Sequence, residues 1–447
     1  MKLLSHLSPF LMGIFTVISL YAANSERLEW TQMIVPLILV LVLSAVISIL
    51  FMLNKWTAKS WAFIASMSIL CLMLWYSITP LYSIIIVVIS LIISMLIPMH
   101  KITQPLSIFL IFAILVSGGQ AVYNSSGDVP VNNPVIAAPA ATAKPNIYFI
   151  VPDRMPSIDA MRESNINPDK FVSDMKSLGF YVKENQMSSD PFKVTDEEIK
   201  TTRTMRYFAS VLNGGIDVPL DMTYKDCRLL IKQGSVFNDI HLQGYTIHNV
   251  ASWFAETKDL PLADYVYKYN NISLLERVFN DELTNAYWSR TIFYGLNFRA
   301  WESEASIGSV ERGRALWQYG KVLELAASGN KSQFVMCHLL MPHEPFVFDK
   351  VGGSTDTSLS IPEQYYSQIE YALSYLSSLA KGILESDPSA IIIIQSDEGM
   401  AYKKPIELNF GLSKTQWNGV LTAWKIEDNI DLSSIKHTDI LKALVRR

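Results

Sequence analysis

The first 122 residues of this 447-residue chain carry almost no charge, and this constrains the fold more than any other feature. Only seven of them are charged, namely Lys2, Glu26, Arg27, Glu29, Lys55, Lys59 and Lys101. In the whole chain 17% of the residues are charged. Seven charges among 122 residues cannot cover a water-exposed surface. The first 122 residues are therefore predicted to form helices that lie in a membrane.

Five apolar stretches divide this segment: 7–23, 31–53, 61–78, 81–98 and 102–122. Each approaches the ~20 residues that a helix needs to cross the hydrocarbon core of a bilayer. We therefore expect residues 1–122 to form a transmembrane anchor of five helices. The first stretch ends in Tyr-Ala-Ala and also fits a cleaved signal peptide, which is the alternative for that stretch alone.

The cations between the stretches predict the orientation. They fall in alternate loops, as Lys2, then Lys55 and Lys59, then Lys101. Cytoplasmic loops carry the excess of Lys and Arg, so the N-terminus is expected in the cytoplasm and everything after Val122 outside the cell (inner) membrane. Every charge lies between stretches, which argues against a transporter, whose pathway usually needs ionisable groups inside the membrane.

Residues 123–144 are rich in Asn, Ser, Gly, Pro, Val and Ala and read as a flexible linker. From residue 145 to 447, strand and helix patterns alternate. Strands are expected at 146–151, 179–183, 245–250, 333–340 and 390–395, and helices at 158–178, 204–212, 226–242, 310–327 and 362–385. This alternation predicts an α/β domain, a mostly parallel sheet sandwiched by helices.

Composition excludes several functions. A net charge of −4 and a pI near 6.0 cannot supply the phosphate neutralisation that nucleic-acid binding requires. Three scattered cysteines, Cys71, Cys227 and Cys337, fit neither a disulfide framework nor a Cys-x-x-Cys metal site.

Two acidic residues follow expected central strands. Asp153 comes after NIYFIVP, and Asp397 comes after AIIIIQS with Glu398 next to it. The ligand site of such a sheet lies beyond the carboxyl ends of its strands, so the two acids are expected to meet and bind a divalent cation. Each acid taken alone would also fit an ordinary turn cap.

A hydroxyl-rich segment, 201–214, reads as a helix that begins near Thr204 and ends at Asn-Gly. The N-terminus of a helix favours anions, and a nearby metal ion would activate the Thr204 hydroxyl as a nucleophile. The alternative is an ordinary helix-capping threonine. His343 lies between prolines in an exposed loop, whereas His338 lies inside an apolar run and is expected to be a hydrogen-bonded core residue.

Five motifs, in this order, resemble the sulfatase/alkaline phosphatase superfamily, and most closely its membrane-bound branch of lipoteichoic acid synthases and phosphoethanolamine transferases. They are PNIYFIVPD (145–153), TTRTMRYFASVLNG (201–214), GYTIHNVASW (244–253), HLLMPHEPFVF (338–348) and IIIIQSDEG (391–399). Members of that branch have five membrane spans followed by an extracytoplasmic catalytic domain, so the resemblance implies the same sulfatase-like organisation here.

The resemblance also implies roles for individual residues. Thr204 would be the covalent nucleophile and, with Asp153 and Asp397, would hold one divalent ion, Mn²⁺, Mg²⁺ or Zn²⁺. Arg203 and His343 would bind the substrate. Glu398 stands where the family normally has a histidine ligand; a carboxylate can take that place, at the cost of a less Lewis-acidic ion.

The function expected from the resemblance is metal-dependent transfer or hydrolysis of a phosphoryl headgroup, phosphoethanolamine- or phosphoglycerol-like, on an envelope lipid or glycan. The segments around Cys227 and Cys337 lack the C/S-x-P-x-R context of sulfatases that use formylglycine, so sulfate-ester hydrolysis is not expected. The departure at Glu398 also leaves open a catalytically impaired relative that binds an envelope glycan or lipid, or scaffolds an assembly.

Overall fold

The structure is a computed structural model that describes residues 4, 6–25, 28, 30–54, 56–73, 85–90, 92–93, 100–125, 143–192, 201–270, 282–288, 291, 304–401, 411–426 and 434–445. The chain divides into two compact units. Unit 1 comprises residues 1–128 and 272–303, and unit 2 comprises residues 129–271 and 304–447. Residues 272–303 lie within the predicted outer domain, 145–447, but these 32 residues belong to unit 1.

Unit 1 is helical. Its elements are α2 (Ser8–Ala22), η1 (Trp30–Met33), α3 (Ile34–Leu53), α4 (Trp61–Met73), α6 (His100–Ser125) and α14 (Glu282–Trp288). Within the described residues, two helices are long and apolar enough to cross a membrane, Trp30–Leu53 and Lys101–Tyr123, while α2 and α4 are shorter apolar helices. Residues 85–90 of the predicted fourth span are helical, but the rest of 81–98 lies mostly outside the described residues, so the five-helix bundle stays a prediction.

The helices of unit 1 bury small polar side chains and expose apolar ones. Ser66 Oγ donates to Ser8 Oγ (2.9 Å), and Ser44 Oγ donates to the carbonyl oxygen of Pro9 (3.4 Å). Large apolar side chains on α3 and α6, such as Leu50 and Phe112, are more than 60% exposed. Small residues between helices and apolar residues outside are typical of helices surrounded by lipid.

Unit 2 is built on a seven-stranded sheet of order β2-β7-β6-β1-β5-β3-β4. The strands are β1 (Ile147–Pro152), β2 (Tyr181–Lys183), β3 (Thr246–Val250), β4 (Tyr265–Tyr267), β5 (Gln333–Leu339), β6 (Ile391–Gln395) and β7 (Thr422–Lys425). The five strands from β6 to β4 are parallel, and β7 is antiparallel to both of its neighbours. Every residue of β1 and β5 is buried, which is typical of central strands in a parallel sheet.

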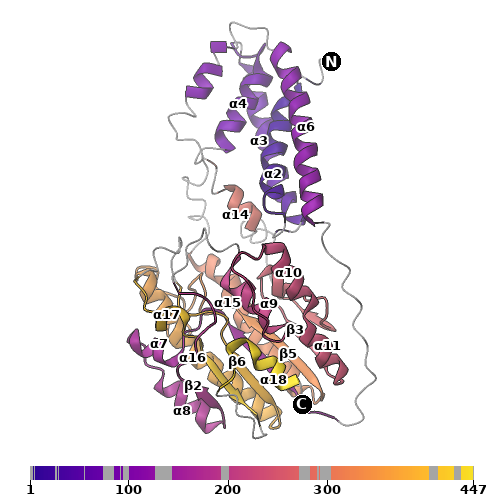
Figure 1. Cartoon of the computed structure of the whole chain (residues 1–447). Helices are drawn as coiled ribbons and strands as arrows, with labels where there is room; N and C mark the ends of the chain where they lie inside the picture. The colour runs from indigo at the N-terminus through magenta and orange to yellow at the C-terminus, as the bar shows by residue number, and fades with distance from the viewer. Residues whose placement is uncertain are drawn as a thin grey trace. The chain divides into compact units, whose positions relative to one another are not determined.

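Helices cover both faces of this sheet (Figure 1). One buried cluster joins the sheet to α7 (Ile158–Glu163), α8 (Asp169–Ser177), α15 (Glu304–Ala327), α16 (Ile361–Ser386) and α17 (Lys414–Asn418). The cluster on the opposite face includes α9 (Arg203–Val211), α10 (Tyr224–Gln233), α11 (Ser235–Leu242) and α18 (Ile440–Val445). The predicted α/β class is therefore confirmed.

Unit 2 also contains two short elements, α12 (Ala255–Lys258) and η5 (His437–Asp439).

Two expected helices are each divided in two. The helix expected at 158–178 is broken where Asn165 adopts a positive φ of 58° and Pro168 follows. The helix expected at 226–242 is divided at Gly234 between α10 and α11. Two short strands, β4 and β7, were not expected. The predicted linker 123–144 lies largely outside the described residues, although α6 continues to Ser125.

Candidate active site

Three neighbouring strands bring acidic and histidine side chains to one edge of the sheet. Asp153 directly follows β1, Asp397 lies two residues beyond β6, and His338 is the penultimate residue of β5. Strand β1 lies between β5 and β6, and its register pairs Val151 with His338. Since parallel strands end at the same edge, these three side chains converge.

The convergence produces a group that fits a metal ion. One ligand atom from each of Asp153, His338 and Asp397 lies within 4.8 Å of the other two. All three residues are at most 2% exposed. Three buried atoms, Asp153 Oδ1, His338 Nε2 and Asp397 Oδ2, have no hydrogen-bond partner among the described residues. Buried polar atoms are nearly always paired, so three unpaired ones at a single place fit the coordination of a cation.

Neighbouring groups orient these side chains. His338 Nδ1 lies 2.8 Å from Thr257 Oγ1. Asp397 Oδ1 accepts from the backbone N–H groups of Arg154 (3.2 Å) and Glu398 (2.8 Å). A histidine whose Nδ1–H is held by a hydrogen bond directs the lone pair of Nε2 towards a metal, and supported carboxylates behave in the same way.

The protonation states agree with this reading. Burial lowers the pKa of His338 to about 3, so its imidazole is neutral at pH 7 and able to coordinate. Burial, together with the charge of Glu398, raises the pKa of Asp397 to about 7. Burial, followed by the charges of Asp397 and Glu398, also raises the pKa of Asp153 well above its usual value. The two carboxylates repel each other without a cation between them.

Thr204 lies at this group. Helix α9 starts at Arg203 and is capped by Thr202, whose Oγ1 accepts from the N–H of Met205 (3.2 Å). Thr204 is only 5% exposed, and its side chain is close enough to Asp397 to lower the pKa of that carboxyl group. The structure therefore brings together three of the predicted site residues, Asp153, Thr204 and Asp397.

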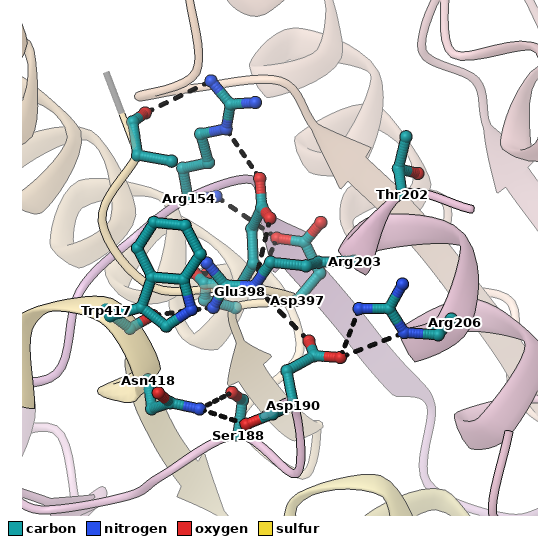
Figure 2. Close-up of polar contacts among 12 residues, drawn as sticks. Arg154, Ser188, Asp190, Thr202, Arg203, Arg206, Asp397, Glu398, Trp417 and Asn418 are labelled. Carbon is teal, nitrogen blue, oxygen red and sulfur yellow. Dashed lines mark hydrogen bonds and ion pairs between the residues drawn. The ribbon is translucent and has the colours of Figure 1, made fainter. Parts of the chain in front are cut away.

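Glu398 lies in a different arrangement from the predicted one (Figure 2). Arg154 Nε donates to Glu398 Oε1 (2.6 Å), and Arg203 Nε lies 3.5 Å from Glu398 Oε2. Both carboxylate oxygens thus face arginines, and Glu398 is not a member of the metal-ligand group. The physical reason for the difference is Arg154, which follows Asp153 and forms an ion pair with Glu398. The pattern of strands in the sequence did not predict this contact.

Arg203 is buried, with 6% of its side chain exposed. Its Nη2 donates to the carbonyl oxygen of Trp417 (2.7 Å), and its guanidinium lies 4.8 Å from the centre of the Trp417 ring. Its Nε lies 3.4 Å from Asp190 Oδ2. Asp190 also binds Arg206, so the acid joins both arginines of α9 (Figure 2).

The loop that contains His343 is held by one buried glutamine. Gln368 Oε1 accepts from the N–H groups of Val347 (2.7 Å) and Phe348 (3.0 Å). Its Nε2 donates to the carbonyl oxygens of Pro342 (3.2 Å) and His343 (3.1 Å). The amide group therefore fixes both ends of the loop.

This loop also reaches the site. The next residue after His343 is Glu344, whose Oε2 accepts from Arg154 Nη1 (3.2 Å). Arg154 thereby links the loop to Glu398 and Asp397. His343 itself packs edge-on against Trp253, with 6.3 Å between the ring centres.

Sequence reasoning missed two site residues. His338 was expected to be a core residue because it lies within an apolar strand; it is buried and hydrogen-bonded, but it also belongs to the metal-ligand group. Its position at the carboxyl end of a central strand was the available signal. Nothing in the sequence pointed to Arg154 as a site residue except its position directly after Asp153.

Comparisons with known proteins concern the fold. No protein-family model matches the sequence, and no curated protein matches it. Similar solved structures include the C-terminal periplasmic domain of EcEptC from Escherichia coli, at 15% identity and a TM-score of 0.41, covering 69% of this chain and 85% of that one.

The lipooligosaccharide phosphoethanolamine transferase EptA from Neisseria meningitidis, an integral membrane protein, matches at 10% identity and a TM-score of 0.39, covering 100% of this chain and 91% of that one. The lipoteichoic acid synthase LtaP from Listeria monocytogenes matches at 10% identity and a TM-score of 0.38, covering 65% and 67%. All three similarities are at 15% identity or less and at TM-scores below 0.5. The roles of residues proposed below rest on the geometry of this chain alone.

Proposed function

We propose that this chain is a membrane-anchored, metal-dependent enzyme that transfers or hydrolyses a phosphoryl headgroup. The observation that carries the proposal is the buried group of Asp153, His338 and Asp397, with its unpaired ligand atoms, beside the hydroxyl of Thr204. A ligand group, a nucleophile and a helix N-terminus at one place are the parts that phosphoryl transfer needs.

The proposed ligands are two carboxylates and one imidazole. This set suits Zn²⁺ or Mn²⁺, and when bound the ion would stabilise negative charge on the oxygens of the phosphoryl group. Glu398, which the sequence pattern placed among the ligands, is left out because two arginines face its oxygens. We propose that Thr204 contacts the same ion, because its side chain is close enough to Asp397 to lower the pKa of that carboxyl group.

The chemistry proposed for Thr204 is nucleophilic. Its Oγ would form a bond to phosphorus while the bond from phosphorus to the leaving alcohol breaks, which gives a phospho-threonine. The hydroxyl proton would pass to the carboxyl group of Asp397, whose pKa the nearby Thr204 lowers, and then to the leaving alcohol. A lipid or sugar hydroxyl, or water, would then take the phosphoryl group and restore the threonine. We propose that His343 contacts the phosphate or the leaving group.

A membrane location supports a lipid or glycan substrate. Helices α3 and α6 present apolar side chains outwards, and the two spans Trp30–Leu53 and Lys101–Tyr123 are long enough to cross a bilayer. The alternation of basic loops supports an N-terminus in the cytoplasm and unit 2 on the outer side of the inner membrane. A catalytic domain tethered at the bilayer meets headgroups at high effective concentration.

The first prediction tests the nucleophile. Thr204→Ala should abolish turnover, because no other hydroxyl is proposed to attack, and it should leave metal uptake in place. The measurement is mass spectrometry of the purified chain after incubation with membrane lipids, which should find a phosphoryl adduct on Thr204 in the wild type and none in the variant. The matched control is Thr223→Ala, which removes the hydroxyl that caps α10 and should keep the adduct.

A binding or scaffolding protein is the second candidate, and Glu398 favours it because both of its carboxylate oxygens face arginines at the position where the resemblance implies a metal ligand. Metal analysis separates the two. Stoichiometric uptake of Zn²⁺ or Mn²⁺ with an adduct on Thr204 supports the enzyme, whereas a folded chain that takes up neither metal supports the binding role.

A further inference from the structure

Arg154 has a backbone conformation that is rare for its residue type. It directly follows Asp153 and has a φ of 61°. This φ lies in the left-handed region, where the backbone of residues other than glycine is strained. This conformation directs its N–H to Asp397 Oδ1 and its guanidinium to the carboxylate of Glu398 (Figure 2). The guanidinium also contacts the carboxylate of Glu344. The contacts on three acidic residues compensate for the strain.

Glu398 is close to the candidate metal ligands, but both of its carboxylate oxygens face arginines. It follows Asp397 in sequence, and its charge raises the pKa of both Asp153 and Asp397. Its Oε1 accepts from Arg154 at 2.6 Å, the shorter of its two arginine contacts. The Arg154 and Glu398 side chains are only 11% and 6% exposed, so water screens their attraction weakly.

We propose that Arg154 is a positioning residue that withholds Glu398 from the metal centre. The inference rests on the metal site of the proposed function and goes beyond it, because it assigns a role to a pair that is not among the ligands. A free carboxylate at this place would coordinate a divalent ion. Paired with Arg154, Glu398 adds neither a ligand nor net charge, so the ion keeps an open position for a substrate oxygen.

A merely structural ion pair would behave differently from this positioning pair. Breaking a buried pair usually disturbs its surroundings, and a disturbed site binds metal more weakly. Under the proposal, removing only Arg154 frees Oε1 of Glu398, the oxygen that Arg203 does not face, and makes metal binding tighter. The two readings therefore predict opposite changes in metal affinity.

The experiment is calorimetric titration of the metal-free, full-length chain in detergent with Mn²⁺ at pH 8. Arg154→Gln should tighten binding by about tenfold or more, because one uncompensated negative charge is added next to the ion. Arg154→Gly should do the same, since glycine adopts a positive φ without strain. The double variant Arg154→Gln with Glu398→Gln removes both charges and should stay within about threefold of the wild type.

Arg162→Gln is the matched control, because Arg162 forms exposed ion pairs with Glu184 and Asp169 and should not affect affinity. Weaker or unchanged Mn²⁺ binding in both folded Arg154 variants would overturn the inference. A loss of Mn²⁺ affinity of about tenfold or more in the double variant would also overturn it. If circular dichroism shows that the single variants are unfolded, the double variant alone is the test. Failure of the wild type to bind Mn²⁺ would instead overturn the proposed metal-dependent function.

Discussion

At the scale of single residues, the two oxygens of Asp397 have different tasks. Oδ1 accepts from the N–H groups of Arg154 and Glu398, while Oδ2 is buried without a hydrogen-bond partner among the described residues. Holding one oxygen fixes the direction of the other. The candidate site is therefore preorganised by backbone donors, which cost no side-chain entropy when a ligand binds.

The raised pKa of Asp397 predicts how the stability of the metal-free protein depends on pH. The folded-state pKa of about 7 lies above the ordinary value of 3.8, so the contribution of this group to stability is complete below pH ~4 and is lost as the pH rises through ~7. Thermal unfolding followed by fluorescence should show a lower melting temperature at pH 8 than at pH 6 when metal is absent.

Two further measurements check this pH prediction. Zn²⁺ or Mn²⁺ should raise the melting temperature more at pH 8 than at pH 6, because binding requires deprotonated carboxylates. Asp397→Asn cannot ionise and should flatten the dependence of the metal-free protein. A melting temperature that rises with pH without metal would contradict the assigned shift.

Asp153, Asp397 and Thr204 were predictable because their positions follow from local patterns, a strand end or a helix start. The partners of Glu398 and His338 were not. A side chain's partner depends on which elements lie beside it, and Arg154, Arg203 and Thr257 are brought there by the packing of the sheet.

At the scale of elements, helix α16 supports the site through one side chain. Gln368 uses both lone pairs and both N–H groups of its amide on the backbone of the loop at 342–348. The turn before it in α16 carries Gln364, whose Nε2 donates to the carbonyl oxygen of Leu359 outside that loop. The two glutamines form a natural pair of test and control.

Gln368→Leu should loosen the loop that contains His343, since it leaves buried backbone groups unpaired at roughly 1–3 kcal/mol each. We expect faster hydrogen exchange at the amides of Val347 and Phe348 and a fall in turnover of about tenfold or more. Metal uptake should persist, because the metal ligands lie outside the loop. Gln364→Leu should change neither quantity; equal effects of the two variants would show that the loop does not depend on Gln368.

The elements themselves were predictable to different degrees. Long apolar runs such as β1, β5 and β6 were found from sequence because strands buried on both faces need no alternation. The short strands β4 and β7 were not, since three or four residues carry too little pattern and their pairing depends on the neighbouring strand. Asn165 and Gly234 ended helices that periodicity alone would have continued.

At the scale of the whole molecule, the chain leaves unit 2 after residue 271, contributes α14 to unit 1 and returns to unit 2 at residue 304. Within unit 1, Tyr287 Oη lies 2.8 Å from Thr16 Oγ1 and donates to Met73 Sδ. Leu283 and Tyr287 are buried in the apolar cluster formed by the helices of unit 1. The insertion therefore belongs to the fold of unit 1 although its sequence neighbours belong to unit 2.

Because α14 packs in unit 1, the structure predicts how a fragment without the N-terminal helices behaves. A fragment of residues 145–447 would expose Leu283 and Tyr287, and we expect it to self-associate in size-exclusion chromatography without detergent. Leu283→Ser with Tyr287→Ser should make the fragment monomeric while destabilising the full-length chain. Val351→Ser, at a side chain that is already 80% exposed, is the control and should leave the association unchanged. A monomeric unmodified fragment would contradict the prediction.

The sequence by itself determined the membrane segment, the α/β class and the positions of Asp153, Asp397 and Thr204, because hydropathy and periodicity are local properties of the chain. Only the tertiary structure decided that His338 joins the acids, that Glu398 is paired with Arg154 and that α14 packs in unit 1. Those contacts join residues up to 271 positions apart, and no local pattern records which distant partner a side chain meets.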